Sequence, residues 1–280
     1  MTDKIDLHTH STRSDGTNTP AELARLAYNA GLRAVALTDH DTVDGVDEFC
    51  AECERLGVEG IRGVEIGTKY KRELHIVGLY AHGDEFDKVI AKLRDGRKIR
   101  NEQMLKKLSE YGFDITEDDI VDKDSGACMD SVGRVHMANA LVKKGYASDR
   151  DDAFERLIAK GRPCYVSRFA LTPEESISFI KRCGGAAIWA HPVYAADSEE
   201  EIRELAMRLK GAGLDGMECY YSRYTDEQTE MCKRIAEETG LLKSGGSDYH
   251  GGNKPDVKIG KVNGGFVPYE LLEKIKERIR

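Results

Sequence analysis

The chain has 280 residues, of which 40% are hydrophobic and 33% are charged, and its formal net charge is −8. This composition is typical of a globular protein that buries a sizeable core, and the acidic balance argues against a general nucleic-acid coat or an anionic membrane surface as a partner. An anionic substrate is not excluded, because the charge at a site can oppose the net charge of the protein.

Short β-rich runs alternate with helical patterns along the chain, which is typical of a parallel β/α architecture. The runs predict strands over residues 4–7, 34–38, 58–64, 74–80, 186–190, 214–219 and 241–243. Helices are expected over residues 20–30, 43–56, 173–183, 199–210 and 226–238. About seven β/α units predict an α/β fold, a distorted (β/α)7 barrel, with an open doubly wound sheet as the alternative.

The alternation stops between residues 95 and 170, where only helical and loop patterns occur. We interpret this stretch as an inserted small helical subdomain that binds substrate. Residues 1–94 and 171–280 would then form the barrel, one large domain of ordinary size for such a fold.

No apolar run approaches the roughly 20 residues that a membrane-spanning helix needs, and the N-terminal residues show no signal-peptide pattern. We therefore expect a cytoplasmic protein without a membrane partner. The seven cysteines lie at scattered spacings, which is typical of reduced thiols. Cys50 and Cys53 form one CxxC inside a helical pattern without a second pair, so we interpret them as structural and not as a zinc or redox site.

Histidines and carboxylates collect where the predicted strands end. They include His8, His10, Asp39, His40, Asp41, Glu65, His191, Asp248 and His250, whereas His75 lies near the start of its strand. Barrel enzymes gather catalytic groups from the carboxyl ends of their strands. A single strand-end histidine is more often structural, but residues two apart in an extended segment, such as His8 and His10, point to the same side and can converge on one ion. Imidazoles with carboxylates suit Mn, Fe or Zn.

The order of these motifs resembles the PHP (polymerase and histidinol phosphatase) superfamily. The matching segments are His8-Thr9-His10-Ser11, Ser14-Asp15-Gly16, Thr38-Asp39-His40-Asp41, Gly63-Val64-Glu65-Ile66, His75, Ala190-His191-Pro192 and Gly246-Ser247-Asp248-Tyr249-His250. They span residues 8 to 250, nearly the whole chain, and their order is more specific than any one of them.

The resemblance implies a distorted seven-stranded barrel that holds two or three divalent transition-metal ions, with Mn²⁺ expected and Fe or Zn as alternatives. Carried over, one ion would take His8, His10, Glu65 and Asp248; a second would share Glu65 and add His75 and His191; a third would use Asp15, His40 and His250. Some relatives have histidine where this chain has Asp15, which leaves a ligand there but alters the third site. Asp39 and Asp41 are expected to orient imidazoles.

The chemistry implied is hydrolysis of a phosphate ester. Water bound to a divalent metal can have a pKa near ~7, so a metal-bound hydroxide is expected to attack phosphorus while the ions neutralise charge on the transferred group. His191 and Asp248 are the expected catalytic residues, and either His191 or a water held by Asp248 would protonate the leaving group.

The predicted insertion resembles one branch of the superfamily, which hydrolyses nucleoside 3′,5′-bisphosphates and includes members that trim short RNA from its 5′ end. The matching segments are Ser131-Val132-Gly133-Arg134-Val135-His136-Met137-Ala138 and Gly161-Arg162-Pro163-Cys164-Tyr165-Val166-Ser167-Arg168, with Val135 where proline is usual. Arg134 and Arg168 are expected to bind phosphate through their planar guanidinium groups, with help from His136. We interpret Arg97, Arg100, Asn101, Tyr220, Tyr221 and Ser222 as structural or surface residues.

The function expected is therefore removal of the 3′-phosphate from nucleoside 3′,5′-bisphosphates, with short oligoribonucleotides as a further substrate class and no stable protein partner. Three alternatives stay open. They are a histidinol-phosphate phosphatase, a polymerase-associated exonuclease domain, and a metal-binding sensor that does not turn over substrate. The arginine-bearing insertion disfavours the first alternative, the lack of a polymerase segment disfavours the second, and nine candidate ligands disfavour the third.

Overall fold

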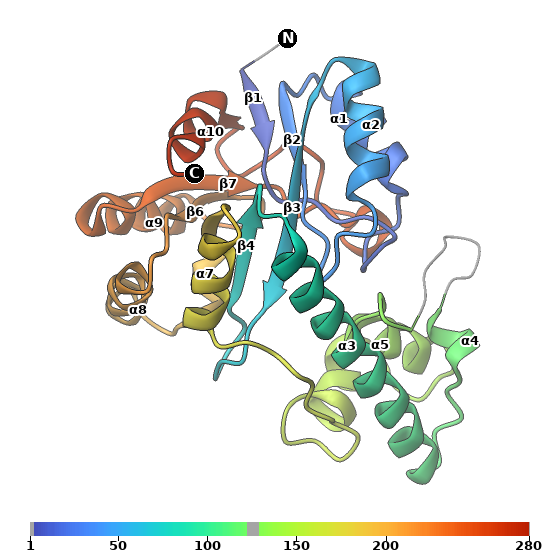
Figure 1. Ribbon diagram of the computed structural model, residues 1–280. Coiled ribbons are helices and arrows are strands. Elements are labelled where there is room, and N and C mark those ends of the chain that lie inside the picture. The colour runs from blue at the N-terminus through green and yellow to red at the C-terminus, as the bar shows by residue number, and fades with distance from the viewer. Residues whose placement is uncertain (1–2, 122–128, 280) are drawn as a thin grey trace.

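The protein is built around one nearly closed sheet of eight strands. The computed structural model describes residues 3–121 and 129–279 (Figure 1). The strands are β1 (Lys4–Asp6), β2 (Ala34–Leu37), β3 (Glu59–Gly67), β4 (His75–Leu79), β5 (Ala186–Ala190), β6 (Gly216–Tyr221), β7 (Leu242–Gly246) and β8 (Val267–Pro268). Their order is β7-β6-β5-β4-β3-β2-β1-β8. The predicted α/β barrel is confirmed, with each of the seven expected strands present and one more added.

The barrel closes where β1 meets β7. The Leu7 N–H donates to Gly245 O at 3.2 Å, and the Asp248 N–H donates to His8 O at 2.8 Å. A Cβ at position 246 would lie 2.4 Å from the Cβ of His8. Only glycine fits so close an approach, so Gly246 lets the last strand reach the first.

Two strands run against the parallel pattern. Strand β4 pairs antiparallel with both β3 and β5, and β8 pairs antiparallel with β1. The expectation of an all-parallel sheet is therefore wrong at these two strands. Because β4 is reversed, its first residue, His75, pairs with Gly67 at the end of β3 and with Ala190 at the end of β5. The start of β4 thus lies at the same edge of the sheet as the ends of its neighbours.

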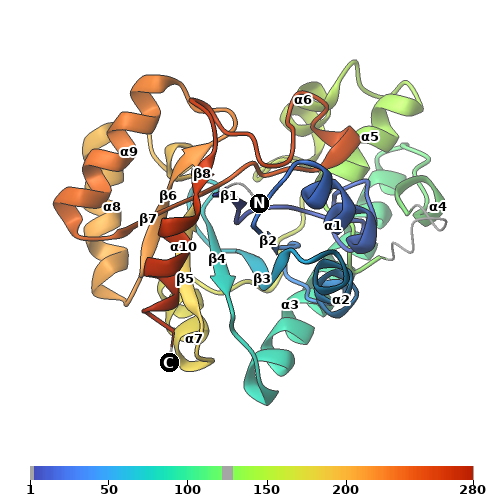
Figure 2. The ribbon, with the colours of Figure 1, turned by 90° about the horizontal axis from the view of Figure 1, so that it is seen from above.

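The predicted barrel helices occur within a few residues of their expected limits. They are α1 (Pro20–Asn29), α2 (Val46–Leu56), α7 (Pro173–Arg182), α8 (Glu199–Gly211) and α9 (Asp226–Thr239). Helix α1 begins with a capping box between Thr19 and Glu22 and has proline in its first turn, two features that stabilise a helix N-terminus. Seen from above, α8 and α9 cover one side of the barrel and α1 and α2 cover the other (Figure 2).

Apolar side chains fill the barrel and separate it from its helices. Inside, residues such as Ile61 and Ile188 form one cluster with Leu272 and Ile275 of α10 (Tyr269–Lys276). Outside, a second cluster joins β4, β5 and β6 to α7, α8 and α9. Helix α10 lies at the end of the barrel away from α4 and α5 (Figure 1), so it covers the end that does not carry the histidines.

The helical region between β4 and α7 begins with the long helix α3 (Asp84–Glu110), which continues through residue 95. Helices α4 (Glu117–Ile120), α5 (Arg134–Lys143) and α6 (Arg150–Ala153) follow, with one π-helical turn at Phe154–Ile158. These helices share a separate apolar cluster that includes Met104 and Leu141. The division at residues 95 and 170 stays a prediction. None of the helices in the described ranges is long and apolar enough to cross a bilayer.

Candidate metal centre

The structure brings all nine predicted ligands into one buried or half-buried cluster at the edge where most of the strands end. His8 and His10 follow β1, Asp15 lies in the next loop, and His40 follows β2. Glu65 lies in β3, His75 begins β4, His191 follows β5, and Asp248 and His250 follow β7. The antiparallel direction of β4 explains why His75 joins the cluster from the start of its strand.

Glu65 is the centre of this arrangement. One carboxylate oxygen, Oε2, lies 3.3 Å from Nε2 of His8, 3.2 Å from Nε2 of His10 and 3.0 Å from Nδ1 of His40. The other oxygen, Oε1, lies 2.8 Å from Nδ1 of His75 and 3.0 Å from Nε2 of His191. Burial raises the pKa of Glu65, but the charges of His40, His8 and His75 outweigh burial and hold it well below its usual value. Glu65 is therefore an ionised carboxylate whose two oxygens face different groups of imidazoles.

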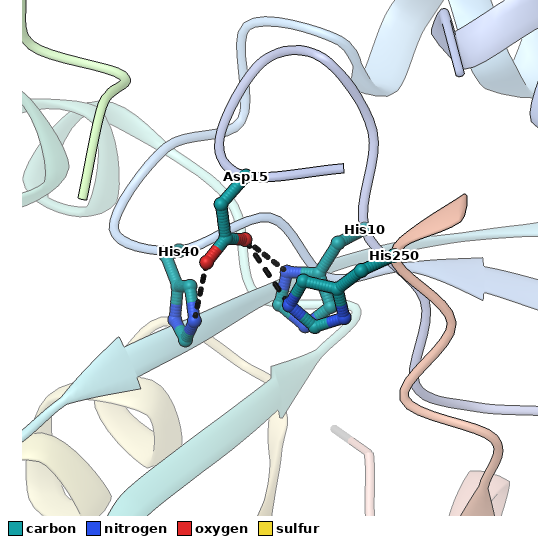
Figure 3. Close-up of side chains that lie close together, drawn as sticks. All are labelled: His10, Asp15, His40 and His250. Atoms are coloured by element: carbon teal, nitrogen blue, oxygen red, sulfur yellow. Dashed lines mark ion pairs between the residues drawn. The ribbon is translucent and has the colours of Figure 1, made fainter. Parts of the chain in front are cut away.

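Asp15 gathers a second set of donors. Its Oδ1 lies 3.2 Å from Nε2 of His250 and 3.6 Å from Nδ1 of His10, and its Oδ2 lies 3.7 Å from Nε2 of His40 (Figure 3). These four residues come from three separate loops and converge on one point. Burial raises the pKa of Asp15, but the charges of His250 and His40 lower it well below its ordinary range.

Asp248 uses its two oxygens differently. Its Oδ1 faces the donor cluster, 3.4 Å from Nε2 of His10 and 3.3 Å from Nδ1 of His250. Its Oδ2 accepts a hydrogen bond from the Tyr221 hydroxyl at 2.6 Å and pairs with Nζ of Lys254 at 2.5 Å. Burial raises the pKa of Asp248, whereas the charges of Lys254, His250 and His8 hold it well below its usual value. The carboxylate is therefore ionised and held in one orientation.

Glu218 supports the cluster from β6 and was missed by sequence reasoning. Its Oε1 lies 2.8 Å from Nδ1 of His8, and its Oε2 accepts the backbone N–H of His191 at 2.7 Å. The contact fixes the proton of His8 on Nδ1 and leaves Nε2 free to face the other donors. A buried acid inside an otherwise apolar strand, as in Gly216–Tyr221, was the available signal.

Asp39 and Asp41 have partners other than the imidazoles expected for them. Asp39 accepts hydrogen bonds from the Ser11 N–H, the Ser11 hydroxyl and the Ser14 hydroxyl. The Ser14 oxygen in turn lies 3.4 Å from Nδ1 of His10, so Asp39 reaches an imidazole only through the loop it holds. Asp41 binds Arg97 and Arg168 instead.

Backbone strain also concentrates at this edge of the sheet. Asp41, His191 and Asp248 have positive φ angles of 56°, 32° and 55° although none is glycine. Such conformations cost roughly 1–3 kcal/mol each and persist where surrounding contacts hold them. Here Glu218 holds His191, Tyr221 and Lys254 hold Asp248, and Arg97 and Arg168 hold Asp41.

The donor set fits divalent transition-metal ions. Ligands about 2.0–2.2 Å from one ion lie some 3–4 Å from each other. The donor contacts above are 3.0–3.7 Å long, apart from the 2.8 Å contact of His75 with Glu65. His8 and His10 bring their Nε2 atoms within 3.1 Å of each other, although only one of two such nitrogens can donate a hydrogen bond to the other. Four groups of three or four donors form from the nine residues, and Glu73 adds a further group with His75 and His191. Which residues bind which ion stays a proposal.

Four arginines form a basic cluster beside His40. Nη2 of Arg97 lies 2.7 Å from Oδ2 of Asp41, and Nη2 of Arg168 lies 2.8 Å from the same oxygen. Arg100 is 5% exposed, and its Nε and Nη2 have no hydrogen-bond partner among the described residues. Burial lowers the pKa of Arg100 well below its usual value, and the neighbouring charges of Arg97, Arg168 and Arg134 lower it further.

The arginine cluster revises the interpretation of α3. Arg97 and Arg100 are buried beside the half-buried Arg134 and Arg168, so treating Arg97 and Arg100 as surface residues was wrong. Asn101 does have the structural role expected of it, since its Nδ2 donates to Met129 O at 2.7 Å and Val132 O at 2.9 Å. A buried guanidinium with two nitrogens that lack an acceptor among the described residues is the arrangement expected of an anion site.

His136 lies at the start of α5, near the same region. Its Nδ1 accepts the Gly133 N–H at 3.0 Å. Burial lowers the pKa of His136, although the charge of Asp15 opposes the shift. A neutral imidazole that accepts at Nδ1 carries its proton on Nε2, so His136 is a hydrogen-bond donor there.

Comparisons with known proteins agree with this geometry. The protein-family model of the PHP domain matches residues 6–162 of this chain. A 5′-3′ exoribonuclease of Haemophilus influenzae is 37% identical over 254 residues, covering 89% of this chain and 91% of that protein. A 3′,5′-nucleoside bisphosphate phosphatase of Chromobacterium violaceum is 31% identical, with 88% and 87% covered.

Solved structures give the same result. A crystal structure of a metal-dependent phosphoesterase from Bifidobacterium adolescentis superposes with a TM-score of 0.84 at 29% identity, covering 99% of this chain and 96% of that one. An amidohydrolase from Chromobacterium violaceum, solved with sulfate and no metal, gives a TM-score of 0.85 at 29% identity, with 99% and 97% covered. The chain is thus a metal-dependent hydrolase of phosphate esters and belongs to the PHP domain family.

Proposed function

We propose that this protein removes the 3′-phosphate from nucleoside 3′,5′-bisphosphates and leaves nucleoside 5′-monophosphates. The observation that carries the proposal is the buried or half-buried arginine cluster next to the nine donors. A substrate with two phosphates can place one at the metal centre and the other against Arg97, Arg100, Arg134 and Arg168. The name of the Chromobacterium violaceum phosphatase supports the same substrate class.

Two or three divalent ions, Mn²⁺ first and Fe or Zn as alternatives, would be held by His8, His10, Asp15, His40, Glu65, His75, His191, Asp248 and His250. Such ions supply an activated water and neutralise charge on the phosphoryl group. Glu65, Asp15 and Asp248 are ionised before any ion arrives, so they attract the cations and keep a bare phosphate out. The centre therefore becomes a phosphate site only when it is loaded.

The reaction exchanges one bond at phosphorus. An oxygen from water bonds to phosphorus, the bond between phosphorus and the 3′-oxygen breaks, and the 3′-oxygen gains a proton. We assign the orientation of the attacking water to the ionised Asp248, which Tyr221 and Lys254 hold in place. We assign the protonation of the 3′-oxygen to His191, whose Nδ1 is buried without a hydrogen-bond partner in the described part of the chain.

The remote phosphate explains why the arginines matter to the rate. Binding a non-reacting group aligns the reacting one and reduces the entropic cost of the reaction. Arg134 lies over the Tyr165 and Phe154 rings, and Arg168 donates to Gly67 O at 3.1 Å. Both guanidinium groups are therefore held by the protein before a 5′-phosphate binds.

Histidinol phosphate fits this site less well. It has one phosphate and carries an ammonium group, which four arginines would repel. Removal of 5′ nucleotides from short RNA is a second candidate, favoured by the name of the Haemophilus influenzae relative. It breaks the same bond between phosphorus and the 3′-oxygen.

The test compares adenosine 3′,5′-bisphosphate with adenosine 3′-monophosphate and histidinol phosphate in the presence of Mn²⁺. We expect the bisphosphate to give adenosine 5′-monophosphate by ³¹P NMR, and the 3′-monophosphate to react with kcat/KM roughly 10–10³-fold lower, as expected if one or two charged contacts are lost. Arg134→Ala and Arg168→Ala should each lower kcat/KM by roughly 10–100-fold without loss of metal. Arg162→Ala, in the exposed part of the same segment, is the control. A 3′-monophosphate product, or equal rates with and without the 5′-phosphate, contradicts the proposal.

A further inference from the structure

Tyr194 is an exposed aromatic side chain in contact with the donor cluster. It lies in the 3-10 turn Pro192–Ala195 that follows His191. Its ring centroid is 5.6 Å from that of His191 and 5.9 Å from that of Tyr221. Tyr221 is buried and binds Asp248, so Tyr194 rests on two residues of the centre while 41% of its own surface stays exposed.

Tyr194 and the arginine cluster lie beside different histidines of the centre. Asp41, which binds Arg97 and Arg168, directly follows His40. From His40, successive ring centroids lie 5.1 Å apart to His75 and 5.1 Å apart again to His191. Arg97 and Arg168 thus lie beside His40 and, through Gly67, beside His75. Tyr194 instead contacts His191.

Other exposed aromatic rings in the described residues lack this position. Tyr28 belongs to α1, Tyr111 ends α3, and Phe266 precedes β8 with Lys4 over its ring at 5.7 Å. Phe169 follows Arg168 on the arginine side, and Lys92 covers its ring at 4.3 Å. Tyr194 instead has Lys254 and Arg223 near its hydroxyl, and each of these cations is paired with a carboxylate, Lys254 with Asp248 and Arg223 with Asp256.

A phosphodiester bound at the metal centre has a second nucleoside that such a side chain could contact. When the bond from phosphorus to the 3′-oxygen of a 5′-terminal nucleotide breaks, the phosphate stays attached to the 5′-oxygen of the next nucleoside. Water supplies the new oxygen on phosphorus, and the released 3′-oxygen takes a proton. If the terminal 5′-phosphate lies against the arginines, the next nucleoside extends beyond the centre and away from them.

We propose that Tyr194 is the stacking platform for the nucleoside on the 3′ side of the scissile phosphate in short 5′-phosphorylated RNA. This inference rests on the proposed function, because it uses the same anchor and the same bond. Aromatic side chains stack on any base, since every base has a π face. The platform therefore selects for the presence of a base and not for its identity.

The test uses the Mn²⁺-loaded protein with two substrates, adenosine 3′,5′-bisphosphate and a 5′-phosphorylated diadenylate. Tyr194→Ala should lower kcat/KM for the dinucleotide by roughly 10-fold more than for the bisphosphate, equivalent to about 1.4 kcal/mol. Most of that loss should appear in KM. Tyr194→Phe keeps the ring and should stay within about 2-fold of the wild type, and Tyr28→Ala is the control for loss of an exposed tyrosine.

A substrate change gives an independent measurement that does not depend on the fold of the variant. Removing the base from the second sugar of the dinucleotide should lower the kcat/KM of the wild type by the same roughly 10-fold. On that substrate, Tyr194→Ala should cause no further loss of kcat/KM. If the kcat/KM losses from base removal and from Tyr194→Ala are additive, the platform role of Tyr194 is wrong. It is also wrong if Tyr194→Ala lowers kcat/KM equally for the dinucleotide and the bisphosphate. Wild-type turnover of the bisphosphate without turnover of the dinucleotide overturns it too, while leaving the proposed function standing. If only the dinucleotide is turned over, the platform survives and the bisphosphate assignment fails.

Discussion

The carboxylate of Glu218 lies 2.8 Å from Nδ1 of His8 and accepts the backbone N–H of His191 at 2.7 Å. Both contacts require an acceptor, and a carboxylate offers two acceptor oxygens whereas an amide offers one. Glu218 thereby fixes two candidate ligands from different strands. It is a positioning residue, because it acts on the centre through these two histidines.

Glu218→Gln should weaken metal binding by about 10–100-fold, the usual cost of losing a partner that orients a ligand. The amide nitrogen would face either the His8 N–H or the His191 N–H and displace it. Metal content after dialysis against a graded chelator measures the effect. Glu230→Gln, which removes an exposed carboxylate paired with Lys233, is the matched control, and equal metal retention in the two variants would rule out the role given to Glu218.

Metal binding should release protons at neutral pH. Burial lowers the pKa of His10, but hydrogen bonds to Asp248 and Glu65 and the charges of Glu65 and Asp15 raise it to about 9. In the metal-free protein His10 is then protonated at pH 7, and it must lose its proton to bind an ion. Metal affinity should therefore rise with pH up to about 9. Calorimetry in buffers of different ionisation enthalpy counts the protons, and a heat that does not depend on the buffer contradicts this reading.

The same shift has a consequence for the metal-free fold. A pKa raised above the usual value of about 6.5 means that protonated His10 stabilises the folded state at low pH. That stabilisation is complete below about pH 6.5 and is lost as the pH rises through about 9. Metal-loaded protein, in which His10 has no proton to lose, should lack this loss when the two forms are unfolded side by side by denaturant.

Asp248→Asn and His191→Ala should each lower kcat by roughly 10²-fold or more, through loss of a proton-transfer group or of a metal ligand. Elemental analysis of the wild type should find two or three ions per chain. In Asp248→Asn the amide replaces a carboxylate that binds Tyr221 and Lys254, so the fold should survive. Near-normal turnover at full metal content in either variant would show that the substituted residue has no role in catalysis.

Much of the centre was predictable because strand ends are visible in the sequence. Val35, Ala36 and Leu37 form a short apolar run that stops at the polar residues Thr38 to Asp41, and the pattern repeats at the other strands. Parallel strands place such ends at one edge without further information. The clustering of most of the histidines follows from that rule alone.

The features that the sequence did not predict depend on contacts between distant segments of the chain. Hydrophobic periodicity does not encode strand direction, so the reversal of β4 and the position of His75 were hidden. Glu218 and Arg100 are ordinary residues of a strand and a helix until other segments bury them. Burial of Arg100 beside Arg97, Arg134 and Arg168 arises because α3, α5 and the segment before α7 meet, which no local pattern shows.

The two nitrogens of Arg100 that lack a partner among the described residues should lower the stability of the protein. Arg100 is 5% exposed with two nitrogens that have no acceptor among the described residues, and burying such groups costs roughly 1–3 kcal/mol. Arg100→Met keeps most of the volume and removes the charge, so in buffer without phosphate or sulfate it should raise the free energy of unfolding by about 1–3 kcal/mol. Its kcat/KM for a bisphosphate should fall, because the group that destabilises the empty site is the one that binds the anion.

Sulfate should stabilise the wild type through preferential binding to the folded state and stabilise Arg100→Met much less. Arg156→Met, which removes an exposed arginine paired with Asp152 in the same helical region, should change stability by no more than about 0.5–1 kcal/mol and leave the response to sulfate intact. If Arg100→Met is instead less stable than the wild type in the absence of anions, Arg100 has a hydrogen-bond acceptor within the folded protein. It is then a structural residue and does not belong to the anion site.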